Sequence, residues 1–358
     1  MFLLPAYANH FASAVGAGTC QTPGSKYTLR ICIIGVRGHY GLALEATGPE
    51  SGHQIVGISA GAPGDSVAPL SDACRAAGHA PRPYEDERRM LDDLRPDVAV
   101  VCGPFERNAQ ISIDAFGRGV HVFCEKPVAT TLADLARLRD AHAASGVRFA
   151  AMMAIRCAPP FHAAWRAVRE GRIGAVRLIN ARKSYKLGER PAHFRSRATS
   201  SGIIPWVGSH AIDWIHWFSA AAFRTVYAAH SAAANRGHGD LEMTALCLFT
   251  LADDILASAS LDYLRPAEAP THGDDRIRVA GTGGVVEVRQ GAAYLIGAAA
   301  SGEECLAAPA PAPLFAGYLD EIAGRGHCIV SAAEVFAVTE ACLLARQSAD
   351  EKRVIQFP

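Results

Sequence analysis

The sequence lacks three features, and each absence excludes a class of protein. Its ten cysteines are scattered with no C-x-x-C pair, which disfavours a zinc ribbon and a disulfide framework and favours a reducing, cytoplasmic setting. Its charges balance, with 35 Lys and Arg against 35 Asp and Glu, so no general field attracts a polyanion and nucleic acid is not an expected partner. No run of eighteen uncharged apolar residues occurs, so no membrane span is predicted.

What is present suffices for about two globular domains. The chain has 358 residues, of which 50% are apolar and 20% are charged. The first 28 residues resemble the apolar part of a secretory signal, but no Lys or Arg precedes that part and the first basic residue is Lys26. We therefore expect residues 1–28 to form a poorly ordered extension.

From residue 29 to residue 155, short apolar strands alternate with helical segments, as in βαβ units on a parallel sheet. The helix that ends at Gly146 is the clearest, because a Thr N-cap opens it. This pattern predicts an α/β fold with a doubly wound, Rossmann-type parallel sheet over residues 29–155. The expected strands are 29–36, 53–60, 97–104, 120–127 and 147–155, and the expected helices are 39–47, 74–78, 86–94, 109–119 and 130–146.

Beyond residue 155 the pattern changes to strands with a period of two, which indicates a second α/β domain over residues 156–358. A final helix begins with a capping box formed by Ser331 and Glu334. We expect a large, mostly antiparallel open sheet. The expected strands are 175–185, 245–263, 276–281 and 284–289, and the expected helices are 160–174 and 331–349.

The turn after the first strand, GVRGHYG, has the glycine spacing of a loosened dinucleotide motif, G-x-x-G-x-x-G instead of G-x-G-x-x-G. Gly35 suits the tight turn, and a helix that starts near Gly38 would offer unpaired N–H groups to a pyrophosphate, with Arg37 beside it. An ordinary βα turn also needs glycine, so this motif alone leaves both interpretations open.

The end of the second strand is where such domains distinguish NAD from NADP. An acidic residue there binds the ribose hydroxyls, and an Arg accommodates the 2′-phosphate. Here the strand ends in Ser59-Ala60-Gly61, so neither determinant is present. Asp65 in the next loop would favour NAD, while the missing carboxylate at position 60 leaves NADP open. The predicted cofactor is therefore NAD or NADP.

The tripeptide Glu125-Lys126-Pro127 follows the strand VHVFC, with VAVVCGP upstream and GRIGAVR downstream. In this order the segments resemble the Gfo/Idh/MocA family of NAD(P)-dependent oxidoreductases, from about residue 29 to the C-terminus. The resemblance implies a Rossmann domain joined to an α/β domain whose open sheet often forms the oligomer interface, and hence a homodimer or homotetramer. It also implies that the Lys126 ammonium polarises the substrate oxygen, with Glu125 lining the nicotinamide site. The expected cofactor contacts are Gly35, Arg37, Gly38, His39, Tyr40, Ser59, Ala60, Pro104, Glu125 and Lys126.

A second stretch, SGIIPWVGSHAIDWIHW (201–217), is similar to the family's pattern G-G-x-x-x-D-x-G-x-H-x-x-D. The resemblance implies that His210 is the general base, because an imidazole with a pKa of about 6.5 can accept a hydroxyl proton near neutrality. Asp213, one helical turn on, would orient His210 or the substrate. Trp206 stands where the family usually has Asp, so it excludes a proton relay through that position and offers an aromatic face to the substrate instead.

Further residues are candidates for the substrate pocket, and some of them could equally have a purely structural role. Arg156 follows the last strand of the first domain, where its guanidinium suits either a substrate contact or an interdomain salt bridge. Tyr185, with Lys183 and Lys186, is a candidate substrate contact. The stretch THGDDR (271–276) is either a loop that enters the active cleft or, as favoured, a solvated turn before a strand.

No metal site is predicted. His210, Asp213 and His216 recur every third residue on a helix, which places the first and last about 120° apart around its axis. His216, Trp214 and Trp217 are more simply interpreted as core or interface residues.

The combined interpretation is hydride transfer between a nicotinamide cofactor and a small molecule: a sugar, an inositol-like polyol or a related hydroxy compound. Two alternatives stay open. The same fold can use bound NAD transiently to cleave or epimerise a glycoside without net oxidation, which the Trp at position 206 and the altered glycine turn motivate. A non-catalytic NAD(P)-sensing protein is the other, and Lys126 and His210 argue against it.

Overall fold

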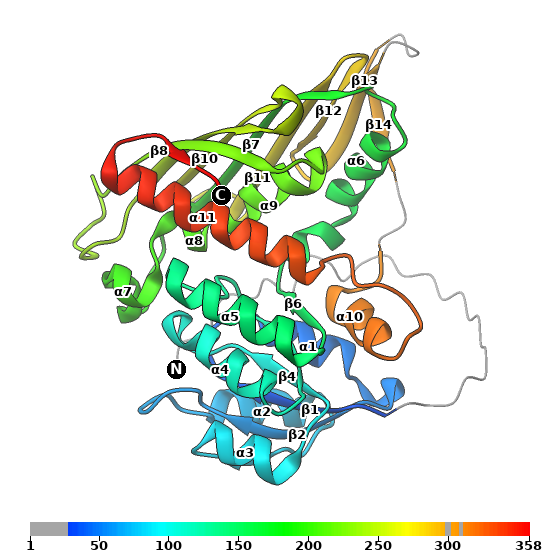
Figure 1. Cartoon of the computed structure of the whole chain (residues 1–358), viewed down its shortest axis with the longest axis vertical. Helices are drawn as coiled ribbons and strands as arrows, with labels where there is room; N and C mark the ends of the chain where they lie inside the picture. Colours follow the sequence, from blue (N-terminus) through cyan, green and yellow to red (C-terminus); the bar gives the residue numbers. More distant parts are fainter. Residues whose placement is uncertain (1–27, 298–301, 308–310) are drawn as a thin grey trace.

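The computed structural model describes residues 28–297, 302–307 and 311–358, which are built around two sheets (Figure 1). The predicted N-terminal extension, except for Thr28, lies outside the described residues. No helix in the described ranges is long and apolar enough to cross a membrane.

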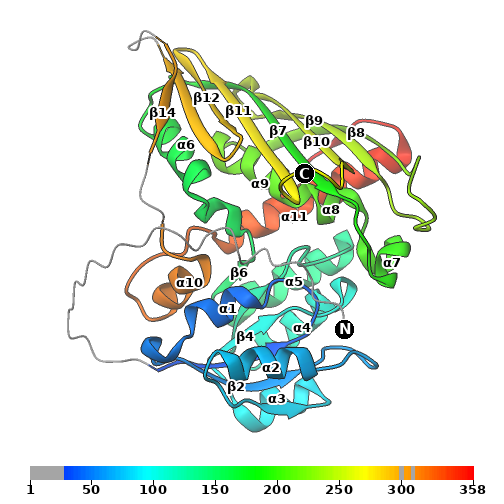
Figure 2. The ribbon, with the colours of Figure 1, turned by 180° about the vertical axis from the view of Figure 1, so that it is seen from behind.

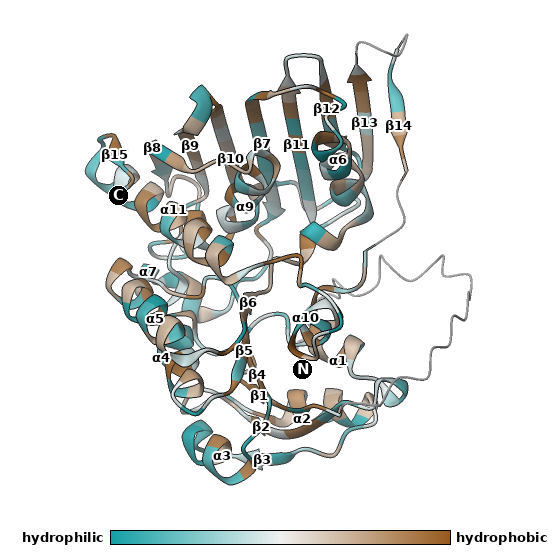
Figure 3. Ribbon diagram, turned by 45° about the vertical axis from the view of Figure 1, so that its right-hand side comes forward, coloured by the Kyte–Doolittle hydropathy of each residue, from teal (hydrophilic) through white to brown (hydrophobic). Residues whose placement is uncertain are grey.

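The first sheet has six parallel strands in the order β3-β2-β1-β4-β5-β6. Helices cover both of its faces, so its central strands are continuous apolar runs, and β1 and β4 form a brown centre in Figure 3. The strands are β1 Arg30–Ile34, β2 Gln54–Ser59, β3 Arg82–Tyr84, β4 Val98–Val101, β5 His121–Cys124 and β6 Phe149–Ala151. The helices are α1 Gly41–Ala46, α2 Ala68–Ala76, α3 Glu87–Leu94, α4 Phe105–Phe116 and α5 Leu132–Ser145, with a 3-10 turn η2 at Pro49–Ser51.

This arrangement confirms the doubly wound class, but several boundaries differ from those predicted. Helix α4 starts four residues before the predicted position, directly after Pro104, whose fixed φ precedes the first turn. Helix α2 starts at Ala68, with a proline in its first turn, six residues early. Strand β3 was not predicted, because its three residues include a proline and form a partly exposed edge.

The second sheet has nine strands in the order β14-β13-β12-β11-β7-β10-β9-β8-β15, and only the β7–β10 pair is parallel. It confirms the predicted open, mostly antiparallel sheet. The strands are β7 Val176–Lys186, β8 Phe223–Ser231, β9 Thr244–Leu251, β10 Leu256–Arg265, β11 Gly273–Gly281, β12 Gly284–Arg289, β13 Ala292–Gly297, β14 Glu304–Leu306 and β15 Ile355–Gln356.

Helices α6, α9 and α11 lie on one face of the second sheet (Figure 1), and seen from behind its strands carry no helix of the described chain (Figure 2). The capping box predicted at Ser331 and Glu334 is present at the start of α11. The helices of this half are α6 Pro159–Arg169, α7 Arg197–Ser200, α8 Ile203–Trp206, α9 Gly208–Ser219, α10 Leu314–Ile322 and α11 Ala332–Glu351, with 3-10 turns η3 Ala154–Cys157, η4 Ala192–Arg195 and η5 Ala252–Asp254.

The predicted turn at 271–276 is largely strand. Strand β11 starts at Gly273, and its polar residues pair with polar residues of β7, Asp274 opposite Ser184 and Asp275 opposite Lys183. A run of charged residues indicated solvent, but here their charges are matched across the sheet.

The two C-terminal helices return to the first sheet. Tyr318 in α10 donates its hydroxyl hydrogen bond to the carbonyl oxygens of Val122 and Arg148, 2.8 and 2.9 Å away. Arg346 in α11 bridges the two halves by donating to Thr130 O at 2.9 Å and to Ser201 O at 3.1 Å. Tyr318 thus binds at the amino ends of β5 and β6, whereas Arg346 joins the second half to the segment that follows the carboxyl end of β5.

Candidate active site

The turn between β1 and α1 fits a dinucleotide. Gly35 and Gly38 have φ of 103° and 112°, and a β-carbon at Gly35 would collide with the Cys102 carbonyl and at Gly38 with the Glu125 carboxylate. The turn lies between β1 and β4, where the strand order reverses and open α/β sheets bind ligands. Helix α1 begins at Gly41, two residues after the start of the expected helix 39–47.

Glu125 ties this turn to the end of β5. Its side chain is fully buried, and Oε2 accepts hydrogen bonds from the backbone N–H of His39 at 2.7 Å and lies 2.6 Å from His39 Nδ1, while Oε1 accepts from Lys126 N at 2.9 Å. Burial alone would raise the pKa of Glu125, but His39 and Lys126 outweigh it and hold the pKa below its usual value. Glu125 is therefore a buried carboxylate that fixes the position of Lys126.

Lys126 reaches from the first sheet to the second half of the molecule. Its side chain is 2% exposed, and Nζ donates to the Trp206 carbonyl oxygen at 2.9 Å and lies 3.5 Å from the centroid of the Trp206 ring. Burial lowers its pKa to about 7, with Lys183 and Arg190 adding to the effect and Glu125 opposing it. An amine with this pKa can donate or accept a proton near neutrality.

Asn108 in α4, which sequence reasoning missed, supports the turn that carries Lys126. Its Nδ2 donates to the carbonyl oxygens of Glu125 and Pro127, at 3.3 and 3.2 Å. The peptide bond between Lys126 and Pro127 is cis. A single Asn among the other polar residues of the amphipathic helix α4 has no distinguishing sequence signal for this role.

His210 in α9 lies beside Lys126, although the two residues come from different halves of the chain. The Trp206 carbonyl that accepts from Lys126 also accepts from Ser209 Oγ at 3.0 Å, next to His210. His210 is 6% exposed, and its Nδ1 has no hydrogen-bond partner among the described residues. Burial, together with the charges of Lys126, Lys183 and His39, lowers its pKa well below 6.5. The imidazole is therefore neutral and able to accept a proton.

Trp206 forms an aromatic wall over Lys126. Its ring stacks on Phe105 with centroids 4.5 Å apart, and Phe194 contacts it edge-on at 5.7 Å. Phe105 begins α4 immediately after the buried Pro104, so this wall joins the segment after the central strand β4 to η4 and α8 of the second half.

Arg156 and Asp213 form a buried ion pair. Arg156 Nη2 is 2.6 Å from Asp213 Oδ1, and Nη1 is 2.6 Å from Glu334 Oε1 and donates to Ile329 O at 2.9 Å. Burial opposes the charge on Arg156, but the two carboxylates raise its pKa above the usual value. Of the two interpretations of Arg156, the geometry corresponds to the salt bridge, and Asp213 holds Arg156 instead of orienting His210.

The far end of the cofactor site is shaped by a second ion pair. Arg37 donates from Nε and Nη2 to the Asp65 carboxylate at 2.9 and 3.0 Å. Ser59 is fully buried at the end of β2, and Ala60 is partly buried. Because Arg37 and Asp65 form an ion pair with each other, the structure does not single out either residue as the one that selects NAD or NADP. Tyr40, at the start of α1, is half-buried, and burial raises its pKa.

The inner face of the second sheet contributes a second buried lysine. Lys183 Nζ is 2.6 Å from Asp275 Oδ2, and Tyr185, 8% exposed, has its ring centroid 4.8 Å from that Nζ. The sequence signal was available, because Lys183 occupies an inward position of the alternating strand β7, between the buried Ala181 and Tyr185. The described residues include no group of three or more His, Cys, Asp or Glu placed to hold a metal ion.

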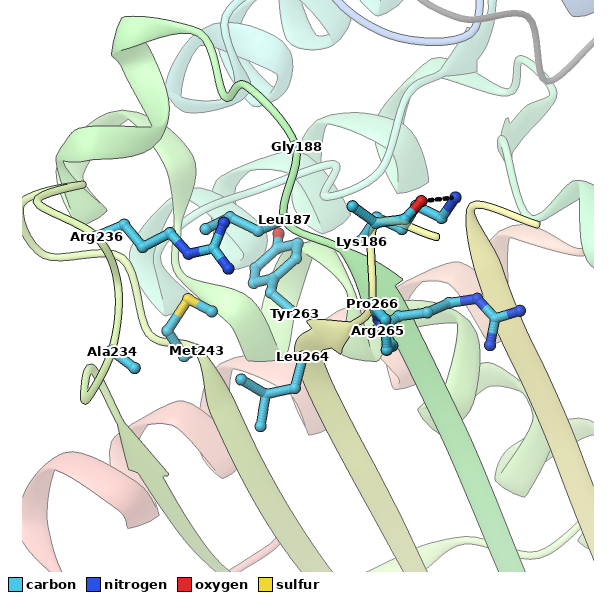
Figure 4. Close-up of a pocket in the computed structure, with 11 residues that line it drawn as sticks. Lys186, Leu187, Gly188, Ala234, Arg236, Met243, Tyr263, Leu264, Arg265 and Pro266 are labelled. Carbon is cyan, nitrogen blue, oxygen red and sulfur yellow. Dashed lines mark hydrogen bonds between the residues drawn. The ribbon is translucent and has the colours of Figure 1, made fainter. Parts of the chain in front are cut away.

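A cavity of about 250 Å³ lies at the ends of β7 and β10, beside Lys186 and Tyr263 (Figure 4). Figure 4 shows Lys186, Tyr263, Arg265 and Arg236 around it. Lys186 Nζ is committed to the carbonyl oxygens of Ala267 and Ala269, so the predicted pocket residue Lys186 belongs to this cavity and not to the site at Lys126.

Comparison with known proteins identifies the family of both halves of the chain. Residues 29–153 match the family model described as "Oxidoreductase family, NAD-binding Rossmann fold", and residues 161–287 match the GFO/IDH/MocA C-terminal domain. An uncharacterised oxidoreductase of Bacillus subtilis is 28% identical over 200 residues, 56% of this chain and 57% of that protein. Inositol 2-dehydrogenase of Salmonella typhimurium is 26% identical over 144 residues, 40% of this chain and 41% of the enzyme. The chain thus spans about half the length of the curated relatives it matches.

Solved structures match over nearly the whole chain. An oxidoreductase-family protein of Thermotoga maritima is 42% identical, with a TM-score of 0.88 over 92% of this chain and 100% of the other. Aldose–aldose oxidoreductase of Caulobacter crescentus, with a TM-score of 0.77 at 20% identity and coverage of 92% and 100%, shares the fold. The chain belongs to the GFO/IDH/MocA oxidoreductase family, with an NAD-binding Rossmann domain followed by the family's C-terminal domain.

Proposed function

We propose that the protein transfers hydride between NAD or NADP and the carbon of a hydroxyl group on a sugar, polyol or related hydroxy compound. The observation that carries this proposal is the convergence of a buried lysine with a pKa of about 7 and a neutral imidazole, Lys126 and His210, beside a turn that fits a dinucleotide. The inositol 2-dehydrogenases among its relatives support a polyol as the substrate.

Each residue then has a distinct role. The turn after β1 and the residues at the end of β5 would hold the nicotinamide cofactor, which when bound would supply the hydride acceptor for oxidation of the substrate hydroxyl to a carbonyl. Lys126 donates a hydrogen bond to the substrate oxygen and polarises it, and the neutral His210 accepts the hydroxyl proton. Glu125 and Asn108 position Lys126, while Trp206 shields it from water.

The proposal is tested by incubating the purified protein with NAD or NADP and a panel of neutral sugars, inositols and sugar acids. We expect at least one compound to change the nicotinamide absorbance with saturating kinetics. Product formed without an absorbance change would favour the glycoside-cleaving or epimerising alternative instead. Dinucleotide binding with no product from any compound in the panel would contradict the proposal and favour the sensing alternative.

The proposed roles predict how oxidation depends on pH. Lys126 must be protonated to polarise the oxygen, and its pKa is about 7, so kcat/KM should fall as the pH rises through this value. In K126R the guanidinium stays protonated, so this decline should move to higher pH. The measurement is initial rate against pH from 5.5 to 9.5. A rate that rises through pH 7 would instead make Lys126 the proton acceptor.

We also propose that the open face of the second sheet joins two copies of the chain, as a homodimer or within a homotetramer. Large apolar side chains project from this face, and Leu246 and Leu248 in β9 are 64% and 53% exposed. We expect L246R/L248E to convert the wild-type oligomer to monomers in light scattering. The control I296R exchanges an exposed residue of β13, nearer the sheet edge, and should have a smaller effect. A monomeric wild-type protein would contradict this assignment.

A cytoplasmic location is proposed from the cysteines. All nine cysteines of the described residues are free, and most are buried. Unpaired buried thiols persist in a reducing compartment, whereas secreted domains commonly join them as disulfides.

A further inference from the structure

The inner face of the second sheet presents a wall of polar side chains towards Lys126 and His210. Lys183 and Tyr185 in β7, Tyr263 in β10 and Asp275 in β11 all point to the face that α9 covers, because they occupy matching positions in the strand register. Trp214 in α9 lies over Lys183, with Nζ 5.4 Å from its ring centroid. Trp214 is four residues after His210 on α9, and residues at this spacing share one face of a helix, so this wall faces the site. In agreement, the charge of Lys183 lowers the pKa of both Lys126 and His210.

Several polar atoms in this wall are buried without a hydrogen-bond partner among the described residues. They include His210 Nδ1, Trp214 Nε1 and Tyr263 Oη, on side chains that are at most 6% exposed. Asp275 Oδ1 and Arg190 Nε are also unpartnered. Buried polar groups are rarely left unsatisfied, so a group of donors and acceptors around one space indicates a polar ligand.

Arg190 carries a positive charge that no carboxylate of this wall balances. Its guanidinium lies 4.6 Å from the Tyr263 ring centroid and 5.6 Å from that of Phe194, and it donates one hydrogen bond, from Nη2 to Lys186 O at 2.9 Å. No carboxylate in the described part of the chain pairs with Arg190. Phe194, which Arg190 contacts, also contacts the Trp206 ring that covers Lys126 Nζ, so Arg190 belongs to the same site. Its charge contributes to lowering the pKa of Lys126.

The remaining charges of the wall cancel in pairs. Lys183 is matched by Asp275, and Lys126 by Glu125, whereas His210 is neutral. Arg190 therefore leaves the site with one positive charge in excess. A partly buried guanidinium is best balanced by a planar monoanion, which it can bind through two parallel hydrogen bonds. A phosphate monoester, with nearly two negative charges at neutral pH, would overbalance it.

We propose that the substrate is a polyhydroxy acid, whose carboxylate binds Arg190 while its reacting hydroxyl lies between Lys126 and His210. The other hydroxyl groups satisfy Trp214 Nε1, Tyr263 Oη and Asp275 Oδ1. The redox step is the one given above: the hydroxyl carbon loses a hydride to the oxidised cofactor and its oxygen loses a proton, while the carboxylate is unchanged. This inference rests on the proposed oxidoreductase function and specifies its substrate class.

The experiment compares matched pairs of compounds with each cofactor: D-gluconate and D-glucuronate against D-glucose, D-galacturonate against D-galactose, and D-glucose 6-phosphate as the phosphate arm. We expect kcat/KM to be at least about 30-fold higher for an acid than for its neutral partner. In R190Q that ratio should fall towards one, mainly through KM, and R190K should retain part of it. The control R236Q removes an exposed arginine that lines the cavity of Figure 4 and belongs to no part of the proposed carboxylate site, so it should keep the ratio.

The outcomes separate this inference from the function on which it rests. Equal turnover of the neutral and the acidic compound of each pair would overturn the inference that the substrate is an acid, but it would leave the proposed oxidoreductase function in place. Preference for the phosphate, or loss of the acid preference in R236Q instead of R190Q, would overturn the carboxylate site at Arg190. If no compound changes the nicotinamide absorbance, the proposed function fails. The change in melting temperature on adding D-gluconate then tests the carboxylate site at Arg190 independently of any reaction. Stabilisation by D-gluconate that R190Q abolishes supports the carboxylate site, and equal stabilisation of both proteins overturns it.

Discussion

Replacing Lys126 with Met is expected to lower kcat/KM about a thousandfold for any substrate that the panel identifies. Methionine nearly preserves the buried volume but cannot donate a hydrogen bond to the substrate oxygen. The loss should fall on kcat, because the ammonium interacts most strongly with the oxygen when negative charge develops on it. Dinucleotide affinity should change by only a few-fold, since the turn with Gly35 and Gly38 remains in place.

The measurement is steady-state kinetics together with dinucleotide titration by fluorescence. K186M is the matched control, because Lys186 lies on the same strand as Lys183 but is bound to the carbonyl oxygens of Ala267 and Ala269. It should keep kcat/KM within a few-fold of the wild type. Full turnover by folded K126M would remove Lys126 from the chemistry and leave His210 as the only candidate in this site.

The part of this site that the sequence could predict is the part encoded by local signals. The tripeptide at Glu125 marks the end of a parallel strand, and the stretch around His210 has helical spacing, so both could be located before any fold was known. The parallel sheet was equally accessible, because buried parallel strands are short, continuous apolar runs. Edge elements such as β3 and β14 have three residues each and little apolar pattern, and they were missed.

The contacts that define the pocket could not be predicted, because they join residues far apart in the sequence. Arg156 was equally consistent with a substrate contact and with a salt bridge, and only the fold brings Asp213 and Glu334 to it. The same holds for Lys183 and Asp275, 92 residues apart, since the charge cluster around Asp275 suggested solvent until β11 placed it opposite β7. Charges are informative about a site only once their partners are known.

Replacing Arg156 with Met is expected to lower the free energy of unfolding by about 3–5 kcal/mol. Arg156 and Asp213 are both fully buried, so removing the guanidinium leaves the Asp213 carboxylate without a counter-charge in a dry environment. The loss also frees Ile329 O and Glu334, which connect η3 to the start of α11. The measurement is urea unfolding of the full-length protein, monitored by tryptophan fluorescence.

R139M is the matched control, because Arg139 pairs with another glutamate of α11, Glu340, but on the surface at 3.4 Å. It should cost no more than about 0.5 kcal/mol, since water screens an exposed pair. The double variant R156M/D213N separates two causes of the lost stability: the missing attraction between Arg156 and Asp213, and the Asp213 carboxylate that is left buried without a counter-charge. If the penalty arises from a buried unpaired carboxylate, the second change should restore a large part of the stability, because the amide carries no charge to desolvate. No recovery would instead assign the loss to the missing hydrogen bonds at Ile329 and Glu334.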